Sequence, residues 1–176
     1  INLFMCEGKD VKLAAPTGRA AKRMMESTGY EATTIHRLLE IAKGSDDNQG
    51  HPGKDENDPL EADVIIVDEM SMVDIKLMNT LLRAIKHGAH LILVGDKDQL
   101  PSVGPGSVLS DIINSRAFPV IELKKIFRQS EESDIVVNAH RINAGLEIDL
   151  DNNSKEFFYL GRGDVNSVVS TVESLI

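Results

Sequence analysis

The sequence predicts an α/β protein in which a parallel β-sheet is flanked by helices. Strand-like and helix-like segments alternate along the chain, and short links join them. Two apolar runs, residues 64–67 and 91–94, have the composition of strands buried on both faces, which is typical of parallel sheets. A helix-like segment lies between these runs. The three segments therefore form a βαβ unit, which predicts a right-handed crossover between parallel strands.

The first elements are predicted from local signals. Residues 11–15 form a short strand candidate. Thr17 can cap a helix that runs to about Thr28, and Gly29 can end that helix because glycine adopts the left-handed conformation easily.

A second helix is expected from about Thr34, closed by Gly44. Its apolar face would consist of Ile35, Leu38, Leu39 and Ala42. Residues 45–63 are rich in Gly, Pro, Asn and acidic side chains. This composition predicts a surface loop or a disordered insert.

The rest of the chain continues the alternation after the strand at residues 64–67. We expect further helices at residues 74–87, 108–115 and 133–144, and further strands at residues 90–94, 120–123 and 157–160. The apolar side chains in register on the helix at 74–87 are Ile75, Met78, Leu82 and Ile85. Asp164 can cap a final helix with an apolar side of Val165, Val168, Val169, Val172 and Leu175.

Composition narrows the possible functions. The chain has 176 residues and a net charge of −9, which argues against binding of nucleic acid through a bulk positive field. Aromatic residues make up only 4%, so extensive base-stacking platforms are not expected. One cysteine excludes an internal disulfide and a cysteine-based zinc site. No apolar run is long enough for a membrane span, and we expect a cytoplasmic protein.

Two adjacent acids follow the buried run at residues 64–67. Asp68 and Glu69 would lie at the carboxyl end of a strand, the edge of a parallel sheet where ligands bind. Asp68 is suited to hold Mg²⁺ through water, because this ion keeps much of its hydration shell. Glu69 is suited to orient or deprotonate a water that attacks a phosphoryl group. The alternative is that both acids are the ordinary polar end of a strand.

The next strand is followed by a glycine-rich polar loop at residues 95–106. Gln99 is a neutral donor and acceptor that could contact a terminal phosphate or the attacking water. The alternative is an ordinary loop after a strand, but two such strands in tandem make that interpretation weaker.

Five segments between residues 12 and 129 resemble, in order, motifs of the RecD-like branch of superfamily 1 DNA helicases, the exodeoxyribonuclease V alpha subunit family. They are Ala14-Ala15-Pro16-Thr17-Gly18-Arg19-Ala20-Ala21, Thr34-Ile35-His36-Arg37-Leu38-Leu39, Asp68-Glu69-Met70-Ser71-Met72-Val73-Asp74, the loop at residues 95–106, and Leu123-Lys124-Lys125-Ile126-Phe127-Arg128-Gln129.

The resemblance implies a RecA-like P-loop NTPase domain that uses ATP and Mg²⁺. It implies that Asp68 serves the metal, Glu69 is the catalytic base, Gln99 senses the γ-phosphate, and Arg128 stabilises transition-state charge. It implies single-stranded DNA contacts by Pro16, Thr17, Gly18, Arg19, Thr34, His36, Pro101, Ser102 and Val103. The activity implied is 5′-to-3′ DNA unwinding in recombination and repair.

One family feature is absent from the sequence. The Walker A loop, glycine-rich and ending in Gly-Lys-Thr or Gly-Lys-Ser, should precede the first matching motif and does not occur. We therefore expect residues 1–145 to be an incomplete first motor domain, with residues 146–176 continuing towards a second one. The expected partners are the missing loop segment and second domain of the same protein, and subunits of a nuclease complex.

Two other functions remain open. The chain could be a non-enzymatic DNA-binding module from a decayed motor, or the motor domain of a conjugative relaxase. The retained Asp68, Glu69, Gln99 and Arg128 oppose the first of these, because a decayed motor has no use for that set. The 176 residues alone are expected to be inactive as an ATPase.

Overall fold

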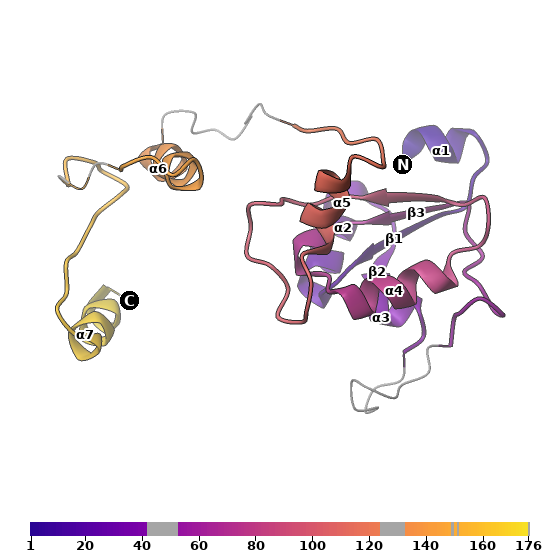
Figure 1. The fold of residues 1–176 in the computed structure, drawn as a ribbon, viewed down its shortest axis with the longest axis horizontal. Coiled ribbons are helices and arrows are strands. Elements are labelled where there is room, and N and C mark those ends of the chain that lie inside the picture. The colour runs from indigo at the N-terminus through magenta and orange to yellow at the C-terminus, as the bar shows by residue number, and fades with distance from the viewer. Residues whose placement is uncertain (42–52, 124–132, 149, 151, 176) are drawn as a thin grey trace. The chain divides into compact units, whose positions relative to one another are not determined.

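The computed structural model describes residues 1–41, 53–123, 133–148, 150 and 152–175. These residues form two compact units, Ile1–Val120 and Ile121–Ile176 (Figure 1). The first unit contains α1 (Asn2–Cys6), β1 (Val11–Ala15), α2 (Gly18–Thr28), β2 (Ala32–Thr34), α3 (Ile35–Leu38), β3 (Val64–Val67), the 3₁₀ helix η1 (Met70–Met72), α4 (Ile75–Ala84), β4 (His90–Leu93) and α5 (Val108–Ser115). The second unit contains α6 (Asp134–Asn143) and α7 (Val165–Leu175).

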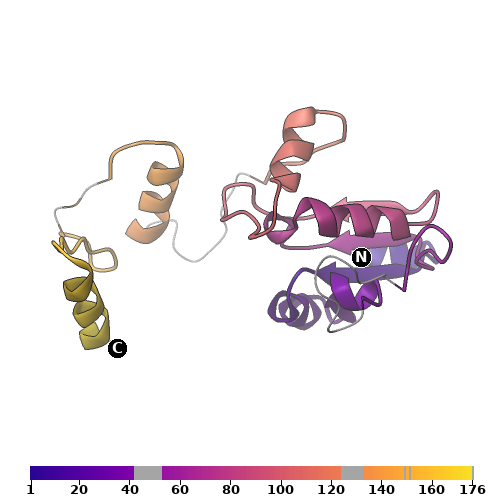
Figure 2. The same ribbon diagram turned by 60° about the horizontal axis from the view of Figure 1, so that its bottom comes forward.

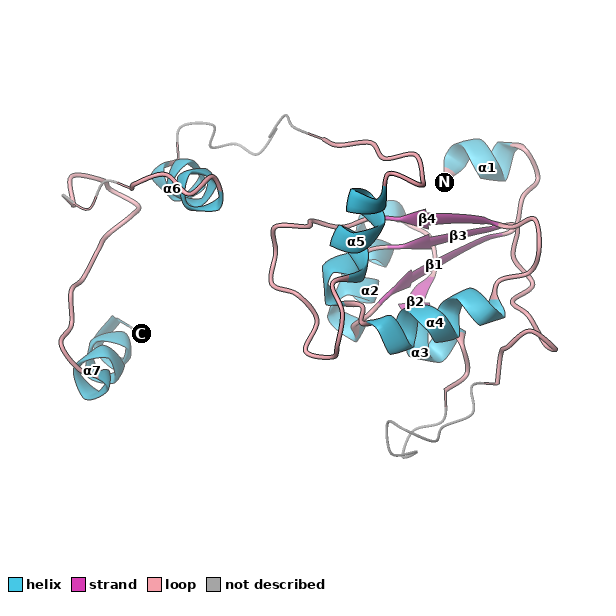
Figure 3. Ribbon diagram, in the orientation of Figure 1, coloured by secondary structure: helices cyan, strands magenta, loops and turns pink. Residues whose placement is uncertain are grey.

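The first unit is built on a parallel four-stranded sheet in the order β2-β1-β3-β4 (Figure 3). Leu13 pairs with Ala32, Val11 with Val64, and Val64 with His90. All three strand pairs are parallel, which confirms the predicted α/β class. The carboxyl ends of the four strands therefore lie along the same edge of the sheet.

Alternating strand residues supply two separate cores. Ile65 and Val67 pack with side chains of α3, α4 and α5, whereas Val64 and Ile66 pack with side chains of α1 and α2. Figure 2 shows α4 along one side of the strands and α2 on the other. All four residues of β3 are buried, as expected for a central strand covered by helices on both faces.

The predicted ends of α2 are confirmed. Thr17 Oγ1 accepts a hydrogen bond from Ala20 N at 3.2 Å. Gly29 ends the helix with a φ of 75°, and its N–H donates to Met25 O. These two residues therefore fix α2 directly after β1, as local sequence signals predict.

The second helix is shorter than predicted. α3 has only four residues, and its N-cap Thr34 is also the last residue of β2. Strand β2 was not predicted from the sequence, because three residues give too little alternation to identify a strand. The expected helix residues Ala42 and Gly44 lie outside the described residues.

The predicted apolar face of α4 is partly wrong. Met78 is buried as expected, but Ile75 and Leu82 are 53% and 51% exposed. The helix instead buries Leu81 and Ala84 beside Met78. It also ends at Ala84, three residues early, where Ala84 O accepts Leu60 N at 2.8 Å and Ile85 forms a bridge with Leu60.

Two predicted strands are also wrong. Residues 120–123 and 157–160 have no regular secondary structure. At residues 157–160, the side chain of Asn152 makes hydrogen bonds that a neighbouring strand would otherwise make. Its Oδ1 accepts Tyr159 N at 2.6 Å, and its Nδ2 donates to Tyr159 O at 3.0 Å.

The helices α5, α6 and α7 confirm the remaining helix predictions to within one or two residues. Asp164 Oδ1 accepts Ser167 N at 3.0 Å at the start of α7, as predicted for a helix cap. The predicted apolar stripe on α7 is exposed within the described residues. Across those residues, no helix has the length and apolar character that would let it cross a membrane.

Charged contacts hold the segment before β3 to the end of α4. Arg83 donates two hydrogen bonds to Glu56, both at 2.8 Å, and Lys86 Nζ lies 3.2 Å from Asp63 Oδ1. The hydrogen bonds from Arg83 lower the pKa of Glu56. The pKa of Asp63 is lowered mainly by the backbone N–H of Asp10, with Lys86 adding to the effect. Both carboxylates are solvent-accessible, so each contributes modestly to stability.

Adjacent leucines test the corrected face of α4. Leu81→Ala should lower the free energy of unfolding by about 2–5 kcal/mol, because Leu81 is fully buried and the substitution leaves a cavity. Leu82→Ala is the matched control and should change it by less than about 1 kcal/mol. Urea denaturation of the purified chain measures both. A larger loss of unfolding free energy for Leu82→Ala than for Leu81→Ala would show that Leu82 faces the core, as the sequence predicts.

The lowered pKa values predict acid-sensitive stability. Folding lowers the pKa of Glu56 and Asp63 from 4.5 and 3.8, so the unfolded chain binds more protons as the pH approaches these values. The resulting stability is present above them and is lost as the pH falls through the folded-state values. Urea midpoints measured from about pH 6 to about pH 3 should fall less steeply in Glu56→Gln than in the wild type. If the urea midpoints of Glu56→Gln and the wild type fell equally steeply with pH, Glu56 would not contribute to the acid sensitivity. The variant Glu61→Gln is the control for removing an acidic side chain from the same loop.

Candidate nucleotide and DNA edge

The predicted site residues that the structure describes follow the carboxyl ends of the four parallel strands. Pro16, Thr17, Gly18 and Arg19 follow β1; Thr34 ends β2 and His36 lies in α3; Asp68 and Glu69 follow β3; Gln99, Pro101, Ser102 and Val103 follow β4. The parallel pairing places these loops at one edge of the sheet. Arg128 lies outside the described residues.

The two acids occupy a sharp turn held by both neighbouring strands. Asp68 N donates to Ala14 O on β1 at 3.0 Å, and Met70 N donates to Val94 O just after β4 at 3.0 Å. Between these bonds, Glu69 N donates to Asp68 Oδ1 at 2.8 Å. The turn is thus fixed on each side by one backbone hydrogen bond and internally by the first carboxylate.

Glu69 adopts a conformation that non-glycine residues rarely use. Its φ and ψ are 55° and 41°, in the left-handed region, and it is the N-cap of η1. This conformation costs roughly 1–2 kcal/mol for an L-residue. Such strain persists where surrounding contacts impose it, and it is concentrated at functional sites. No local sequence signal predicts this geometry.

The acids could serve one metal ion that retains most of its water. Asp68 is partly buried and one of its carboxylate oxygens already accepts Glu69 N, so its other oxygen is the candidate acceptor for a water of the metal's shell. Among the described residues, no group of three or more His, Cys, Asp or Glu side chains could hold a metal by itself. A single available carboxylate fits Mg²⁺, which prefers oxygen ligands and relies on water and phosphate for the rest of its shell.

The loop after β4 has a braced base and an exposed tip. Ser102 Oγ donates to Gly104 O at 2.9 Å and lies 3.3 Å from Gly106 O, so it braces residues 102–106. Gln99 is exposed, and the neighbouring Leu100 is 86% exposed. The tip therefore presents polar and apolar side chains to solvent.

The residues after β1 and β2 have both structural and surface roles. The hydroxyl oxygens of Thr17 and Thr34 accept N–H groups of Ala20 and Arg37, each at 3.2 Å, and so cap α2 and α3. Accepting in this way leaves each hydroxyl hydrogen able to donate to another group. Arg19 and His36 are exposed.

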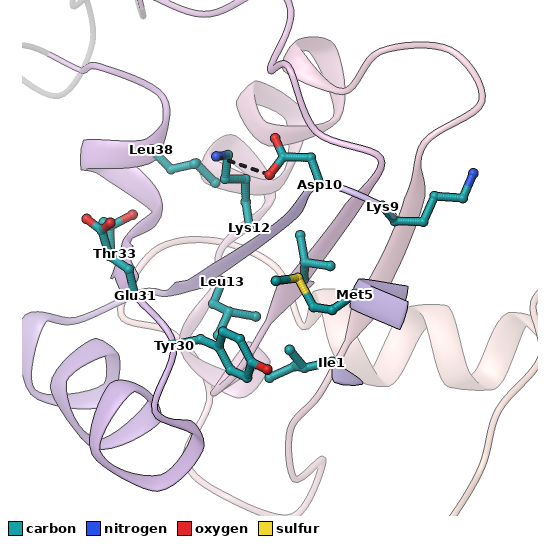
Figure 4. A pocket seen from close by; sticks show the side chains of 11 residues that line it. Ile1, Met5, Lys9, Asp10, Lys12, Leu13, Tyr30, Glu31, Thr33 and Leu38 are labelled. Carbon is teal, nitrogen blue, oxygen red and sulfur yellow. Dashed lines mark ion pairs between the residues drawn. The ribbon is translucent and has the colours of Figure 1, made fainter. Parts of the chain in front are cut away.

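A cavity elsewhere contains none of the predicted site residues. It has a volume of about 360 Å³ and is lined by residues of α1, β1, β2 and α3 and of the segments just before β1 and β2 (Figure 4). Lys12 at its rim forms an ion pair with Asp10 at 3.4 Å. Tyr30, Met5 and Leu13 form its apolar part. The site predicted from sequence is therefore an open sheet edge and not this cavity.

The parallel sheet, the helices on both faces and the acids at the end of a buried strand define an α/β domain of the P-loop NTPase class. Comparisons with known proteins agree. A family model described as an AAA domain matches residues 2–156. The chain belongs to this family, and its relatives identify it as a RecD-like superfamily 1 helicase sequence.

Three relatives show the extent of the similarity. The ATP-dependent RecD2 DNA helicase of Deinococcus radiodurans is 41% identical over 140 residues, which cover 78% of this chain and 18% of that protein. The RecBCD enzyme subunit RecD of Mycolicibacterium smegmatis is 39% identical over 150 residues, covering 74% of this chain and 26% of that protein. Among solved structures, the crystal structure of Bacteroides sp Pif1 in complex with ADP-AlF4 matches with a TM-score of 0.50 and a sequence identity of 28%. The match covers 77% of this chain and 37% of the Pif1 chain. The chain thus spans 18% and 26% of the length of these two curated relatives.

Substitutions at Glu69 test the strained turn. Glu69→Val should unfold more easily than Glu69→Gly by about 1–2 kcal/mol, because a β-branched residue is disfavoured in the left-handed region and glycine is not. Chemical denaturation of both variants gives this difference directly. Glycine and valine variants of equal stability would show that residue 69 has an ordinary extended or helical backbone.

Proposed function

We propose that this chain forms part of the first motor domain of an ATP-dependent 5′-to-3′ DNA helicase that moves along single-stranded DNA in recombination or repair. Residues 1–145 belong to that domain, and residues 146–176 continue towards a second one. The observation that supports this most strongly is the common sheet edge, where the β3 acids lie between loops that follow β1 and β4. ATP-side and DNA-side residues can therefore act from adjacent loops of one sheet.

On the ATP side, each proposed site residue has a different role in phosphoryl transfer. Asp68 would hold Mg²⁺ through water, and the ion would supply positive charge beside the phosphates. Glu69 accepts a proton from the attacking water, for which its carboxylate must face the phosphate. Gln99 contacts the γ-phosphate or that water, and Arg128 stabilises the charge of the transition state.

On the DNA side, binding is independent of base sequence. Pro16, Thr17, Gly18, Arg19, Thr34, His36, Pro101, Ser102 and Val103 are the proposed contacts. The hydroxyl hydrogens of Thr17 and Thr34 can donate to phosphate oxygens. Arg19, Lys22 and Arg23 lie in the first turns of α2, where the helix dipole disfavours cations. A bound phosphate backbone would offset that cost, which supports a DNA contact at this helix.

Other parts are needed for activity. The 176 residues contain no Gly-Lys-Thr phosphate-binding loop, so by themselves they should hydrolyse little ATP. The loop and a second RecA-like domain of the same protein are the proposed intramolecular partners. Subunits of a nuclease complex are proposed as further partners, because one relative is named a RecBCD enzyme subunit. Work on chromosomal DNA in such a complex would take place in the cytoplasm.

The variant Glu69→Gln tests the proposed chemistry in the natural protein that contains this chain. It should abolish DNA-stimulated ATP hydrolysis, because an amide cannot accept the proton, while nucleotide affinity stays close to that of the wild type. Single-turnover hydrolysis and fluorescent-nucleotide titration separate the two effects.

Glu61→Gln is the control, since Glu61 is an exposed acid before β3 and outside the proposed site. An equal loss of nucleotide binding and hydrolysis in Glu69→Gln would assign Glu69 to binding rather than to proton transfer.

A further inference from the structure

The loop after β4 is joined to the segment that follows the two acids. At the far end of this loop, Ile75 N, the first N–H of α4, donates to Pro105 O at 3.0 Å. Gly106 has a φ of 100°, and a Cβ there would lie 3.2 Å from Ile75 Cβ. Residues 105 and 106 therefore pack directly on the start of α4.

Asp74 and Gly104 make the tightest contact of this interface. A Cβ added to Gly104 would overlap Asp74 Oδ2 and would lie 2.7 Å from Asp74 Cγ and 2.8 Å from Asp74 Cβ. The φ of Gly104 is outside the left-handed region, so its backbone does not require glycine. The requirement for glycine at this position comes from the Asp74 side chain.

Neither partner of this contact can move away easily. Asp74 Oδ1 accepts Leu77 N at 2.8 Å, which fixes the carboxylate as the N-cap of α4. Ser102 Oγ donates to Gly104 O and lies near Gly106 O, which fixes the loop side. The contact therefore joins two braced segments and can pass a displacement from one to the other.

The near end of the loop is joined to the same segment. A Cβ on Gly95 would lie 2.9 Å from Met70 N, and Met70 N itself donates to Val94 O. The loop at residues 95–106 is thus attached at its start to the residue after Glu69 and at its end to Asp74 and Ile75. Its exposed tip, with Leu100 and Val103, extends between these two attachments.

We propose that Asp74 is a positioning residue that couples the Glu69 turn to the loop at residues 95–106 by direct contact with Gly104. This inference rests on the proposed function, in which the turn serves ATP and the loop tip serves DNA. A displacement of the turn on nucleotide binding shifts η1 and the start of α4, and the Asp74–Gly104 contact moves the loop with them. The contact acts on the coupling between the two sites and not on the chemical step.

A complementary pair of substitutions tests this contact in the natural protein that contains the chain. Gly104→Ala should lower the ratio of DNA-stimulated to DNA-free ATP hydrolysis about tenfold, within the usual range of coupling between sites. The double variant Asp74→Gly with Gly104→Ala should restore the ratio, because it removes all three Asp74 atoms that crowd the new methyl group, and glycine is an acceptable N-cap. Gly163→Ala is the matched control, since a Cβ at Gly163 meets nothing within 4 Å.

Two further measurements separate coupling from folding. Amide hydrogen exchange at Ile75 should be faster in Gly104→Ala, because the bond to Pro105 O is strained, and it should recover in the double variant. The thermal unfolding midpoint of Gly104→Ala should fall because of the same crowding, so the ratios are compared at a temperature well below the midpoints of all variants.

The outcomes distinguish the proposals. A wild type without DNA-stimulated hydrolysis would overturn the proposed function, and the inference with it. An unchanged ratio in Gly104→Ala, despite faster exchange at Ile75, would overturn the coupling alone. A ratio that the double variant fails to restore would overturn the direct contact as its cause.

Discussion

The backbone hydrogen bonds at the end of β3 determine the geometry of the candidate site. Asp68 N is bonded to β1 through Ala14 O, and Met70 N is bonded to Val94 O after β4. These bonds hold the chain on both sides of Glu69. Between them, Glu69 adopts the left-handed conformation. Because β3 is buried on both faces, the turn cannot relax by shifting the strand. The two carboxylates are consequently presented at the sheet edge by a strand that is buried on both faces.

The rest of the first unit is arranged around this constraint. Helices on both faces bury the alternating side chains of β3, and α4 begins only a few residues after the turn. The loop after β4 packs back on the same segment at Gly95 and Gly104. The turn proposed for phosphate chemistry and the loop proposed for DNA binding thus contact each other directly.

Local signals predicted much of this fold, and the errors have physical causes. Thr17 and Gly29 predicted both ends of α2, and the apolar run of β3 predicted a buried parallel strand. The face of α4 was mistaken because apolar residues such as Leu81 and Leu82 lie on two sides of the helix, and only packing decides between them. Strand β2 depends on pairing with distant residues of β1. The side chain of Asn152 occupies the backbone groups of Tyr159 that a strand would have used.

For the site, the sequence predicted which residues follow the strands, while the conformation of Glu69 and the Asp74–Gly104 contact depend on tertiary structure. The most direct test of the central claim is a structure of the natural protein with an ATP transition-state analogue, Mg²⁺ and single-stranded DNA. We expect Asp68 to face the water shell of the metal and Glu69 to contact the attacking water at the end of β3. A nucleotide bound away from this edge, with both carboxylates facing bulk solvent, would contradict it.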